Sequence, residues 1–150
     1  MFFSCIESKD KNVISKWVYT EEYSKFNYAV TDEGWVDKFC LKANSFCFKV
    51  TINNEIIGIC LFIIERNNEF RILINPKFLQ KGFGRQITNY AINFAFKELD
   101  FKLISLIVRK SHTIAIDMYK KLDFKIVGET EEVFNGQTIE FYKMHLIKGE

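Results

Sequence analysis

The spacing of apolar residues along the chain predicts a domain that mixes strands and helices. Short apolar runs bounded by turn residues predict strands, and apolar residues that recur every three or four positions predict amphipathic helices. The expected strands cover residues 2–8, 45–52, 55–65, 69–75, 102–109, 124–134 and 137–147, and the expected helices cover residues 11–22, 33–43, 83–98 and 112–122. Asp10 and Asp32 are the expected caps of the first two helices. We therefore expect a single α/β domain, of the α+β type, over residues 1–150, with about seven strands and about four helices.

Pairs of residues that tolerate positive φ angles predict where the strands turn back. The Asn-Asn pairs at 53–54 and 67–68 and the Asn-Gly pair at 135–136 are of this kind. A two-residue turn at 53–54 would place Cys47 directly opposite Cys60 across the hairpin. We expect both thiols to be free, as is usual for a cytoplasmic protein.

One connection differs from the hairpins. The strands at 69–75 and 102–109 are joined by the helix at 83–98. Strand–helix–strand connections of this kind are right-handed and make the two strands parallel. The sheet is therefore expected to be mixed and mostly antiparallel, with a parallel βαβ crossover at its centre. Ligands of such sheets tend to bind beyond the carboxyl ends of the parallel strands.

Composition argues against several classes of function. The chain has 150 residues, 48% of them hydrophobic, and its formal net charge of +2 is spread along the sequence without the basic stripe of a nucleic-acid-binding protein. The apolar start at residues 1–6 is too short for a membrane span or a signal peptide. The four cysteines lack CxxC spacing and there are two histidines, so no metal site is expected. We expect a cytoplasmic protein that binds neither membrane nor nucleic acid.

Residues 76–87 carry the strongest functional signal in the chain. A Gly-x-Gly sequence at 82–84 lies between an expected strand and an expected helix, with Lys81 and Arg85 on either side. Backbone N–H groups without a neighbouring Cβ, together with the helix dipole, suit a phosphate or pyrophosphate. The dinucleotide fingerprint fails because its third small residue would be Ile87, and the ATP/GTP loop fails because Arg-Gln follows the second glycine. An anionic, nucleotide-like cofactor is expected.

Two segments of the sequence resemble one family. Leu79-Gln80-Lys81-Gly82-Phe83-Gly84 resembles the Gln/Arg-x-x-Gly-x-Gly/Ala signature of the GNAT superfamily of acetyl-CoA-dependent N-acetyltransferases, with Leu79 as a departure. Residues 112–124 are similar to the superfamily's Asn-x-x-Ala-Ile-x-x-Tyr-x-x-x-Gly-Phe. The matching positions are Ala115, Ile116, Tyr119 and Phe124, whereas His112 replaces Asn and Asp123 replaces Gly. An ordinary strand-to-helix turn would explain the first segment alone, but not both. The resemblance covers roughly residues 45–148 and implies a GNAT-like fold with a splayed central pair of strands.

The resemblance implies acetyl-CoA as the cosubstrate and no metal. The residues that it assigns to acetyl-CoA are Ile72, Leu73 and Ile74 through their backbone, the loop residues Gln80, Lys81, Gly82, Phe83, Gly84 and Arg85, and also His112 and Tyr119. The reaction would be direct attack of an amine on the thioester in a ternary complex.

Two residues are candidates for catalysis. Tyr119 occupies the position whose phenol, in the family that the chain resembles, gives a proton to the departing thiol, and the alternative is a core aromatic. A base or a proton wire is also needed, because a free alkylamine has a pKa of ~10.4 and is mostly protonated at pH 7. Glu69 lies where many amine-acetylating relatives carry a strand Glu and is the candidate base. The alternative is a solvated residue that pairs with nothing or with Arg71 on the same strand face.

The acceptor is expected to be a cationic primary amine, such as a polyamine, an amino sugar, a lysine side chain or a protein N-terminus. The turn at 135–136 would set Glu131 opposite Glu140, and Glu21 and Glu22 would add to the same negative field. Solvated, screened carboxylates are the alternative for all four. The chain is expected to be a monomer or a homodimer. A GNAT-fold module that binds acyl-CoA without catalysis, or a phosphate-binding domain of another kind, are the other functions left open.

Overall fold

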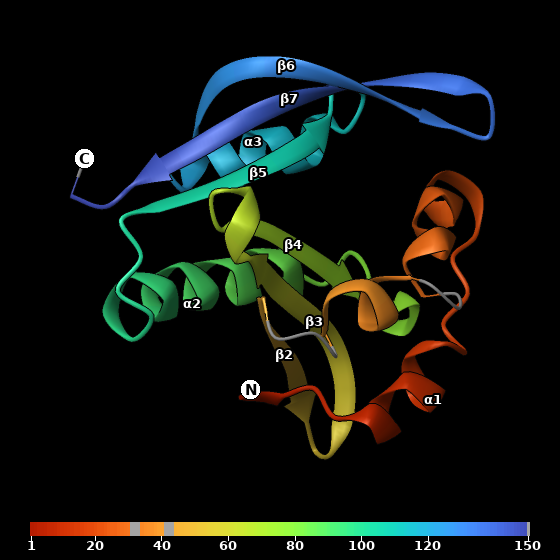
Figure 1. Cartoon of the computed structure of the whole chain (residues 1–150). Helices are drawn as coiled ribbons and strands as arrows, with labels where there is room; N and C mark the ends of the chain where they lie inside the picture. Colours follow the sequence, from red (N-terminus) through yellow and green to blue (C-terminus); the bar gives the residue numbers. More distant parts are fainter. Residues whose placement is uncertain (31–33, 41–43, 150) are drawn as a thin grey trace.

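The computed structural model describes residues 1–30, 34–40 and 44–149 of the chain (Figure 1). Its centre is a seven-stranded sheet with the order β1-β2-β3-β4-β5-β7-β6. The strands are β1 (Phe2–Cys5), β2 (Ser45–Ile52), β3 (Glu55–Ile63), β4 (Glu69–Ile74), β5 (Leu103–Arg109), β6 (Lys125–Phe134) and β7 (Gln137–Ile147). Neighbouring strands are antiparallel except β4 and β5, which are parallel. The predicted mixed sheet with one central parallel crossover is therefore confirmed.

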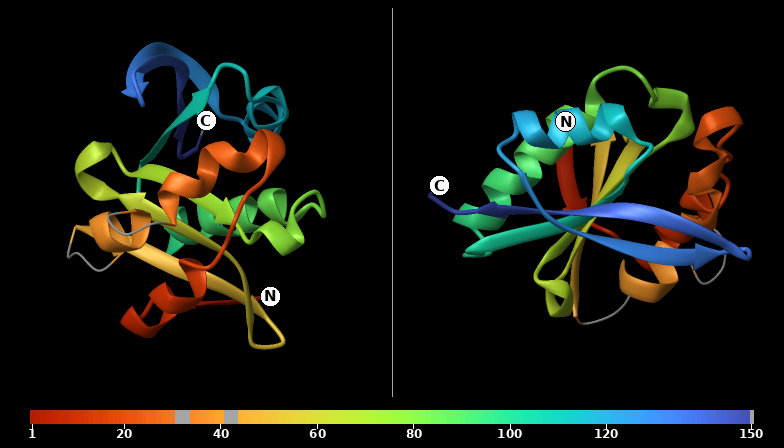
Figure 2. Two further views of the ribbon diagram at one scale, coloured as in Figure 1. Left: turned by 90° about the vertical axis from the view of Figure 1, so that its right-hand side faces the viewer. Right: turned by 90° about the horizontal axis from the view of Figure 1, so that it is seen from above.

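Helical segments cover both faces of this sheet (Figure 2). They are η1 (Ser8–Asp10), α1 (Lys11–Ile14), η2 (Glu21–Ala29), η3 (Val36–Cys40), η4 (Ile64–Arg66), η5 (Pro76–Phe78), α2 (Phe83–Lys97) and α3 (Thr113–Lys121). The two longest α-helices, α2 and α3, pack on one face, whereas α1, η2 and η3 pack on the other. η3 is a single π-helical turn, and the other η segments are 3-10 helices.

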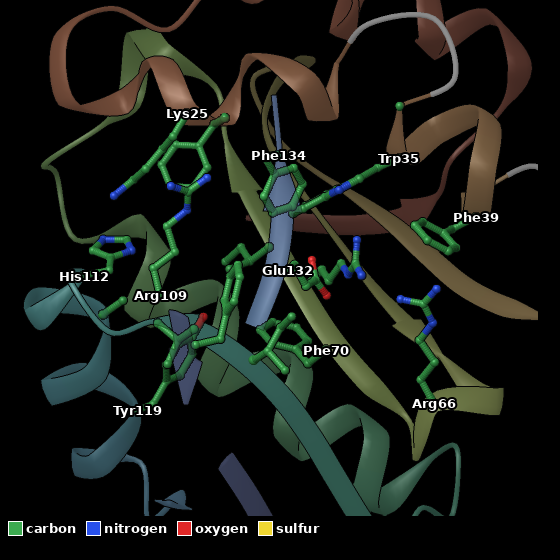
Figure 3. Close-up of a pocket in the computed structure, with 18 of the residues that line it drawn as sticks. Lys25, Trp35, Phe39, Arg66, Phe70, Arg109, His112, Tyr119, Glu132 and Phe134 are labelled. Carbon is green, nitrogen blue, oxygen red and sulfur yellow. The ribbon is translucent and has the colours of Figure 1, made fainter. Parts of the chain in front are cut away.

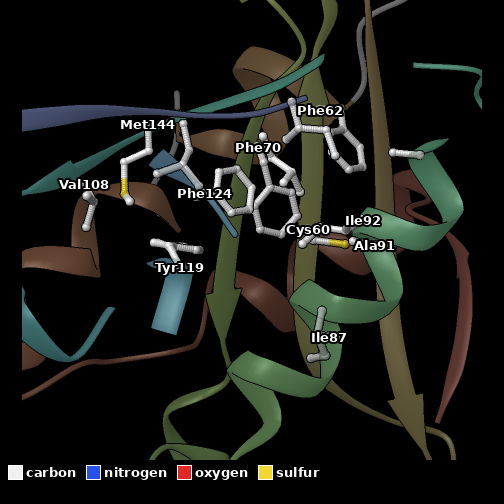
Figure 4. Close-up of a cluster of buried hydrophobic side chains, with 14 of the residues drawn as sticks. Cys60, Phe62, Phe70, Ile87, Ala91, Ile92, Val108, Tyr119, Phe124 and Met144 are labelled. Carbon is white, nitrogen blue, oxygen red and sulfur yellow. The ribbon is translucent and has the colours of Figure 1, made fainter. Parts of the chain in front are cut away.

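Two apolar clusters, one on each face, hold the helices to the sheet. Beneath α2 and α3, Ile87 and Phe124 belong to the same cluster as Phe62 and Met144 of the sheet, and each of the four is at most 2% exposed (Figure 4). The second cluster joins the N-terminal segments to β3. Residues 56–63 of β3 are all buried, because alternate side chains of a strand enter opposite clusters.

The parallel strands β4 and β5 meet only at their amino ends, where Glu69 pairs with Ser105. Side chains hold this end together: Ser105 Oγ donates to the Arg66 carbonyl at 2.9 Å, and Asn68 Nδ2 donates to the Leu103 carbonyl at 3.0 Å. Within the described strands no second pair forms, so the two strands diverge toward their carboxyl ends. This is the splay that the resemblance implies, and it leaves the carboxyl half of β4 without a strand partner on that side.

The helix predicted at 11–22 is wrong beyond its first turn. After α1 the chain is extended, with Trp17 and Tyr19 buried and Val18 between them 67% exposed. Residues two apart share a face in an extended segment but not in a helix, so burial of both aromatic rings excludes the helix here. Asn27 fixes this segment, because its side chain accepts from the Tyr19 N–H at 2.7 Å and donates to the Tyr19 carbonyl at 3.0 Å.

The two predicted helix caps have different outcomes. Asp10 precedes α1 but makes no side-chain cap bond to it. Its carboxylate instead accepts from the Glu7 N–H at 2.8 Å and from Lys49 Nζ at 2.9 Å. The second helix was predicted over residues 33–43, and the described part of that range contains the single turn of η3. Its predicted cap, Asp32, lies outside the described residues.

The register of the first hairpin differs from the prediction by one residue. The turn at 53–54 forms as predicted, with φ angles of 50° and 65°. A bulge leaves Ile57 as an extra residue on β3, so Cys47 pairs with Leu61 and not with Cys60. A shift of one residue turns a side chain to the other face, and the two thiols therefore enter different apolar clusters.

We expect four thiols to react when the unfolded protein is titrated without reductant, since all four cysteines are free. In the folded protein Cys47 and Cys60 should react most slowly, because the thiolate is the nucleophile and the pKa of both thiols is raised. A hydrogen bond with Cys40 and burial raise the pKa of Cys47, and burial raises that of Cys60 to about 12. Cys5 is exposed and provides the internal reference. A Cys47–Cys60 crosslink, or reaction of Cys60 as fast as Cys5, would contradict the observed register.

Candidate active site

A cavity of about 610 Å³ opens beside the splay of β4 and β5, on the face that η2 and η3 cover (Figure 3). Its walls come from β4, β5, α3, η2, residues 34–35, η3, η4 and the β6–β7 hairpin. In Figure 3, Tyr119 and Phe70 lie on the side of the sheet and α3, and Lys25, Phe134 and Trp35 lie opposite them. A volume of this size is typical of small-molecule sites.

Tyr119 reaches this cavity from α3. Its side chain is mostly buried, with the residue 8% exposed, and its ring meets Phe124 edge to face at 5.6 Å between centroids. Burial raises the pKa of the phenol, so Tyr119 carries its proton at neutral pH. Within the described part of the chain its hydroxyl has no hydrogen-bond partner. Tyr119 is thus a core aromatic whose polar end is available to a ligand.

Glu69 lies at the paired end of β4 and does not line the cavity. Its carboxylate accepts from Arg71 Nε at 2.9 Å and lies 3.9 Å from the Arg66 guanidinium. The pairing with Arg71 is the one that the sequence left open, but Glu69 is 8% exposed and not solvated. The position of Glu69 therefore gives no support to a role as the base.

The loop between β4 and α2 has the geometry of a phosphate site. Gln80 and Gly82 have φ angles of 60° and 81°, which turn the chain sharply before α2 begins at Phe83. A Cβ built at Gly84 would meet no heavy atom within 4 Å, so the space beside the first turn of α2 is open. N–H groups of a first helical turn have no acceptor within the helix, and the helix dipole favours an anion there. These features fit the pyrophosphate of acetyl-CoA.

Side chains around this loop explain its departure from the family signature. Leu79, where the signature has Gln or Arg, packs against the apolar cluster on the N-terminal face. Gln80 donates through Nε2 to the Tyr23 hydroxyl at 2.8 Å, which ties the loop to η2. Lys81 and Arg85 are exposed beside the loop, where their charges add to its attraction for an anion.

The three strand residues assigned to acetyl-CoA have different surroundings. Ile72 lines the cavity, Leu73 is 3% exposed in the cluster on the N-terminal face, and the Ile74 carbonyl accepts a hydrogen bond from the Tyr19 hydroxyl. All three belong to the part of β4 that β5 leaves unpaired. The Ile74 carbonyl is thus occupied by Tyr19, and Ile72 is the one of the three that lines the cavity at the splay.

His112 stands at the start of α3 and lines the cavity beside Tyr119. Its ring lies 6.1 Å from the ring of Phe26, centroid to centroid. Burial, together with the nearby charges of Lys25 and Arg109, lowers the pKa of the imidazole to about 4. His112 is therefore neutral at pH 7 and can act there through hydrogen bonds but not through charge.

The four glutamates expected to attract the acceptor lie outside the cavity lining. Glu131 pairs with Glu140, as the turn predicts, but both are exposed, and Glu140 lies 4.0 Å from Lys110 on the face away from the cavity. Glu21 and Glu22 are exposed in the first turn of η2. The structure therefore gives no support to direct contact between these carboxylates and an acceptor.

Glu132 is the carboxylate that lines the cavity. Strand alternation places it on the opposite face of β6 from Glu131, together with Phe134 and, across the hairpin, Phe141. Figure 3 shows it in the middle of the cavity wall. No other Asp or Glu occurs among the described residues that line the cavity. The sequence pattern indicated Glu131 and Glu140 instead of Glu132, although strand alternation already places Glu131 and Glu132 on opposite faces of the hairpin.

Two other features are absent from residues 1–30, 34–40 and 44–149. No group of three or more His, Cys, Asp and Glu side chains there could hold a metal ion. In the same residues no helix has the length and apolarity needed to cross a membrane.

Comparison with known proteins agrees with this geometry. A family model described as the Acetyltransferase (GNAT) family matches residues 13–124. Spermidine N(1)-acetyltransferase of Escherichia coli K12 is 28% identical over 139 residues, which span 88% of this chain and 73% of the relative. Acetyltransferase PseH of Campylobacter jejuni is 24% identical over 140 residues, 89% of this chain and 88% of the relative. A solved structure of a mutant spermidine N-acetyltransferase SpeG from Vibrio cholerae has a TM-score of 0.76 and 26% identity, and the match covers 98% of this chain and 95% of that one.

Proposed function

Because the chain belongs to the GNAT acetyltransferase family, we propose that it transfers the acetyl group of acetyl-CoA directly to a primary amine held in the cavity. The observation that carries the proposal is the placement of Tyr119, which is buried, protonated and open to the cavity at the splay of β4 and β5. The open first turn of α2 supports the binding of acetyl-CoA, because it offers unpaired N–H groups to a pyrophosphate.

Acetyl-CoA supplies the acetyl group as a thioester. The N–H groups at 83–85 would hold its pyrophosphate, and the free edge of β4 would orient its pantetheine arm and thioester carbonyl. The amine nitrogen bonds to the acetyl carbon as the carbon–sulfur bond breaks, and Tyr119 gives its proton to the departing sulfur. The protonated amine loses two protons in all: one returns to Tyr119, and the other leaves to solvent.

We assign to Glu132 the binding of the protonated amine and the removal of its proton. A primary amine with a pKa of ~10.4 arrives protonated at pH 7, and a partly buried carboxylate can pair with it and pass its proton to water. Relatives named as spermidine N(1)-acetyltransferases support an acceptor that carries an ammonium group, the class expected from the sequence. Glu132 takes the place proposed for Glu69, which faces Arg71 instead.

Replacing Glu132 with Gln tests this assignment. The KM for the amine should rise about tenfold, because a charge-assisted contact is lost, whereas the KM for acetyl-CoA should change by less than about twofold. Steady-state kinetics with each substrate varied in turn measures both values. Glu131→Gln is the matched control, since the two neighbours face opposite sides of β6. Equal increases in the two variants would point to the general field of the hairpin and contradict direct contact.

A further inference from the structure

The cavity has more positive than negative side chains in its walls. Lys25 of η2 and Arg109 of β5 lie at one end in Figure 3, and Arg66 lies at the other, with Glu132 between them. Arg71 of β4 also lines the cavity. A site for an acceptor whose only charges are ammonium groups would instead be lined mainly by carboxylates, because like charges repel at short range.

The charges at the two ends are balanced differently. Arg71 is paired with Glu69 at 2.9 Å, and Arg66 lies 3.9 Å from the same carboxylate. In contrast, no ion pair joins Lys25 or Arg109 to a carboxylate among the residues that the structure describes. Lys25 and Arg109 are therefore cations without a carboxylate partner at the end that also contains Tyr119 and His112 (Figure 3). At the other end Arg66 and Arg71 share one carboxylate, and Lys38 of η3 adds a further charge to the lining.

Lys25 and Arg109 are close enough to disturb each other. Burial lowers the pKa of the Lys25 ammonium, and the Arg109 charge lowers it further, with partial compensation from Glu22. Each cation rests on an aromatic ring: Lys25 Nζ lies 5.4 Å from the centroid of Phe26, and the Arg109 guanidinium lies 5.8 Å from that of Phe134. Two like charges in one partly buried wall are unfavourable alone, and an anion placed between them would stabilise both.

We propose that the acceptor carries, besides its primary amine, an anionic oxygen group, a carboxylate or a phosphate, that Lys25 and Arg109 bind. The proposal rests on the proposed function and adds the substrate class to it. Glu132 receives the ammonium, and the two cations receive the anion at one end of the same cavity. A guanidinium matches the planar oxygens of either group, and the Lys ammonium adds a point charge. A polyamine would place further ammonium groups against both cations.

A panel of short amines tests the proposal with the full chain, acetyl-CoA and detection of the acetylated product by mass spectrometry. The carboxylate arm compares γ-aminobutyrate with butylamine and putrescine, and the phosphate arm compares aminopropyl phosphate with aminopropanol. In at least one arm, kcat/KM for the anionic amine should exceed that for its uncharged partner by about 10- to 100-fold. Putrescine should be the poorest substrate of the panel, and the two arms tell carboxylate from phosphate.

Two variants assign the effect to the cations. Lys25→Met and Arg109→Met should each lower kcat/KM for the preferred anionic amine by about 10- to 100-fold, with less than about a twofold change for butylamine or aminopropanol. Lys110→Met is the matched control, because Lys110 follows Arg109 in the chain but pairs with Glu129 on the face away from the cavity. Lys110→Met should change neither kcat/KM for the anionic amine nor kcat/KM for the uncharged amine.

The outcomes separate this inference from the function on which it rests. Putrescine as the best substrate, or an equal loss for charged and uncharged amines in the two variants, would overturn the anionic group while leaving acetyl transfer in place. Absence of acetylated product from every amine of the panel would contradict the proposed function itself.

Discussion

Tyr119→Phe is expected to lower kcat by about 10²-fold, because the reaction loses the proton donor for the departing sulfur. This factor lies at the low end of the range for a general acid, because a thiol has a pKa of ~8.5 and its thiolate leaves readily without a proton donor. The ring remains, so the edge-to-face contact with Phe124 is kept. The hydroxyl has no partner within the described residues, and the unfolding temperature should therefore be unchanged. Single-turnover kinetics with saturating substrates measures the effect on chemistry.

The pH dependence of the unaltered chain gives a second test of this role. A raised pKa keeps the Tyr119 phenol protonated as the pH rises, so kcat should not fall on the alkaline side below about pH 10, the ordinary pKa of Tyr. Tyr90→Phe is the control for the Tyr119→Phe variant, because it also removes a phenol hydroxyl. Tyr90 is exposed on α2 and stacks on Phe3 outside the cavity. A Tyr119→Phe protein with unaltered kcat would show that this ring has a packing role alone.

Gly84→Val is expected to weaken acetyl-CoA binding by about 10²-fold or more, the equivalent of a few lost charge-assisted hydrogen bonds. The new side chain would occupy the open space beside the first turn of α2, where the pyrophosphate must approach the backbone. The same open space means that the variant should fold, since its Cβ meets no other atom within 4 Å. Titration calorimetry with acetyl-CoA measures the affinity.

A control on the same helix separates this effect from a change in helix stability. Asn89 is exposed further along α2, and Asn89→Val introduces the same β-branched side chain away from the first turn. It should leave the affinity for acetyl-CoA unchanged. Equal affinities in folded Gly84→Val and unaltered protein would refute the assignment of the pyrophosphate to this loop.

Features that depend on a few adjacent residues were predicted correctly. The turns at 53–54, 67–68 and 135–136 all adopt the positive φ angles that Asn and Gly tolerate, and they join the antiparallel pairs β2–β3, β3–β4 and β6–β7. The parallel crossover follows from the length of the connection between β4 and β5, and the pairing of Glu131 with Glu140 follows from the last turn. In each case a local rule fixes the geometry whatever the rest of the chain does.

Features that depend on distant contacts were missed. The bulge at Ile57, which separates Cys47 from Cys60, is decided by how β3 fits its neighbours and has no local signal. The segment around Trp17 and Tyr19 has apolar spacing that also suits a helix, but burial of both rings against the sheet favours an extended chain. Propensity is a weak guide where tertiary packing competes with it.

The residues of the candidate site also fall into these two groups, those with a local sequence signal and those that only distant contacts bring together. The glycine loop and Tyr119 lie in contiguous motifs, and a resemblance between sequences can find them. Lys25, Arg109 and Glu132 come from η2, β5 and β6, and only the folded sheet brings them to one cavity. Alternation along β6 distinguishes Glu132 from Glu131, but which face of the hairpin borders the cavity is settled by the packing of η2 and η3.

The most direct test of the account is whether the purified chain forms an acetylated amine from acetyl-CoA. With the amine panel described above, mass spectrometry should find the N-acetyl product and free CoA in equal amounts, and both should fall in Tyr119→Phe. Binding of acetyl-CoA without acetylation of any amine would contradict catalysis and identify the chain as a module that binds acyl-CoA.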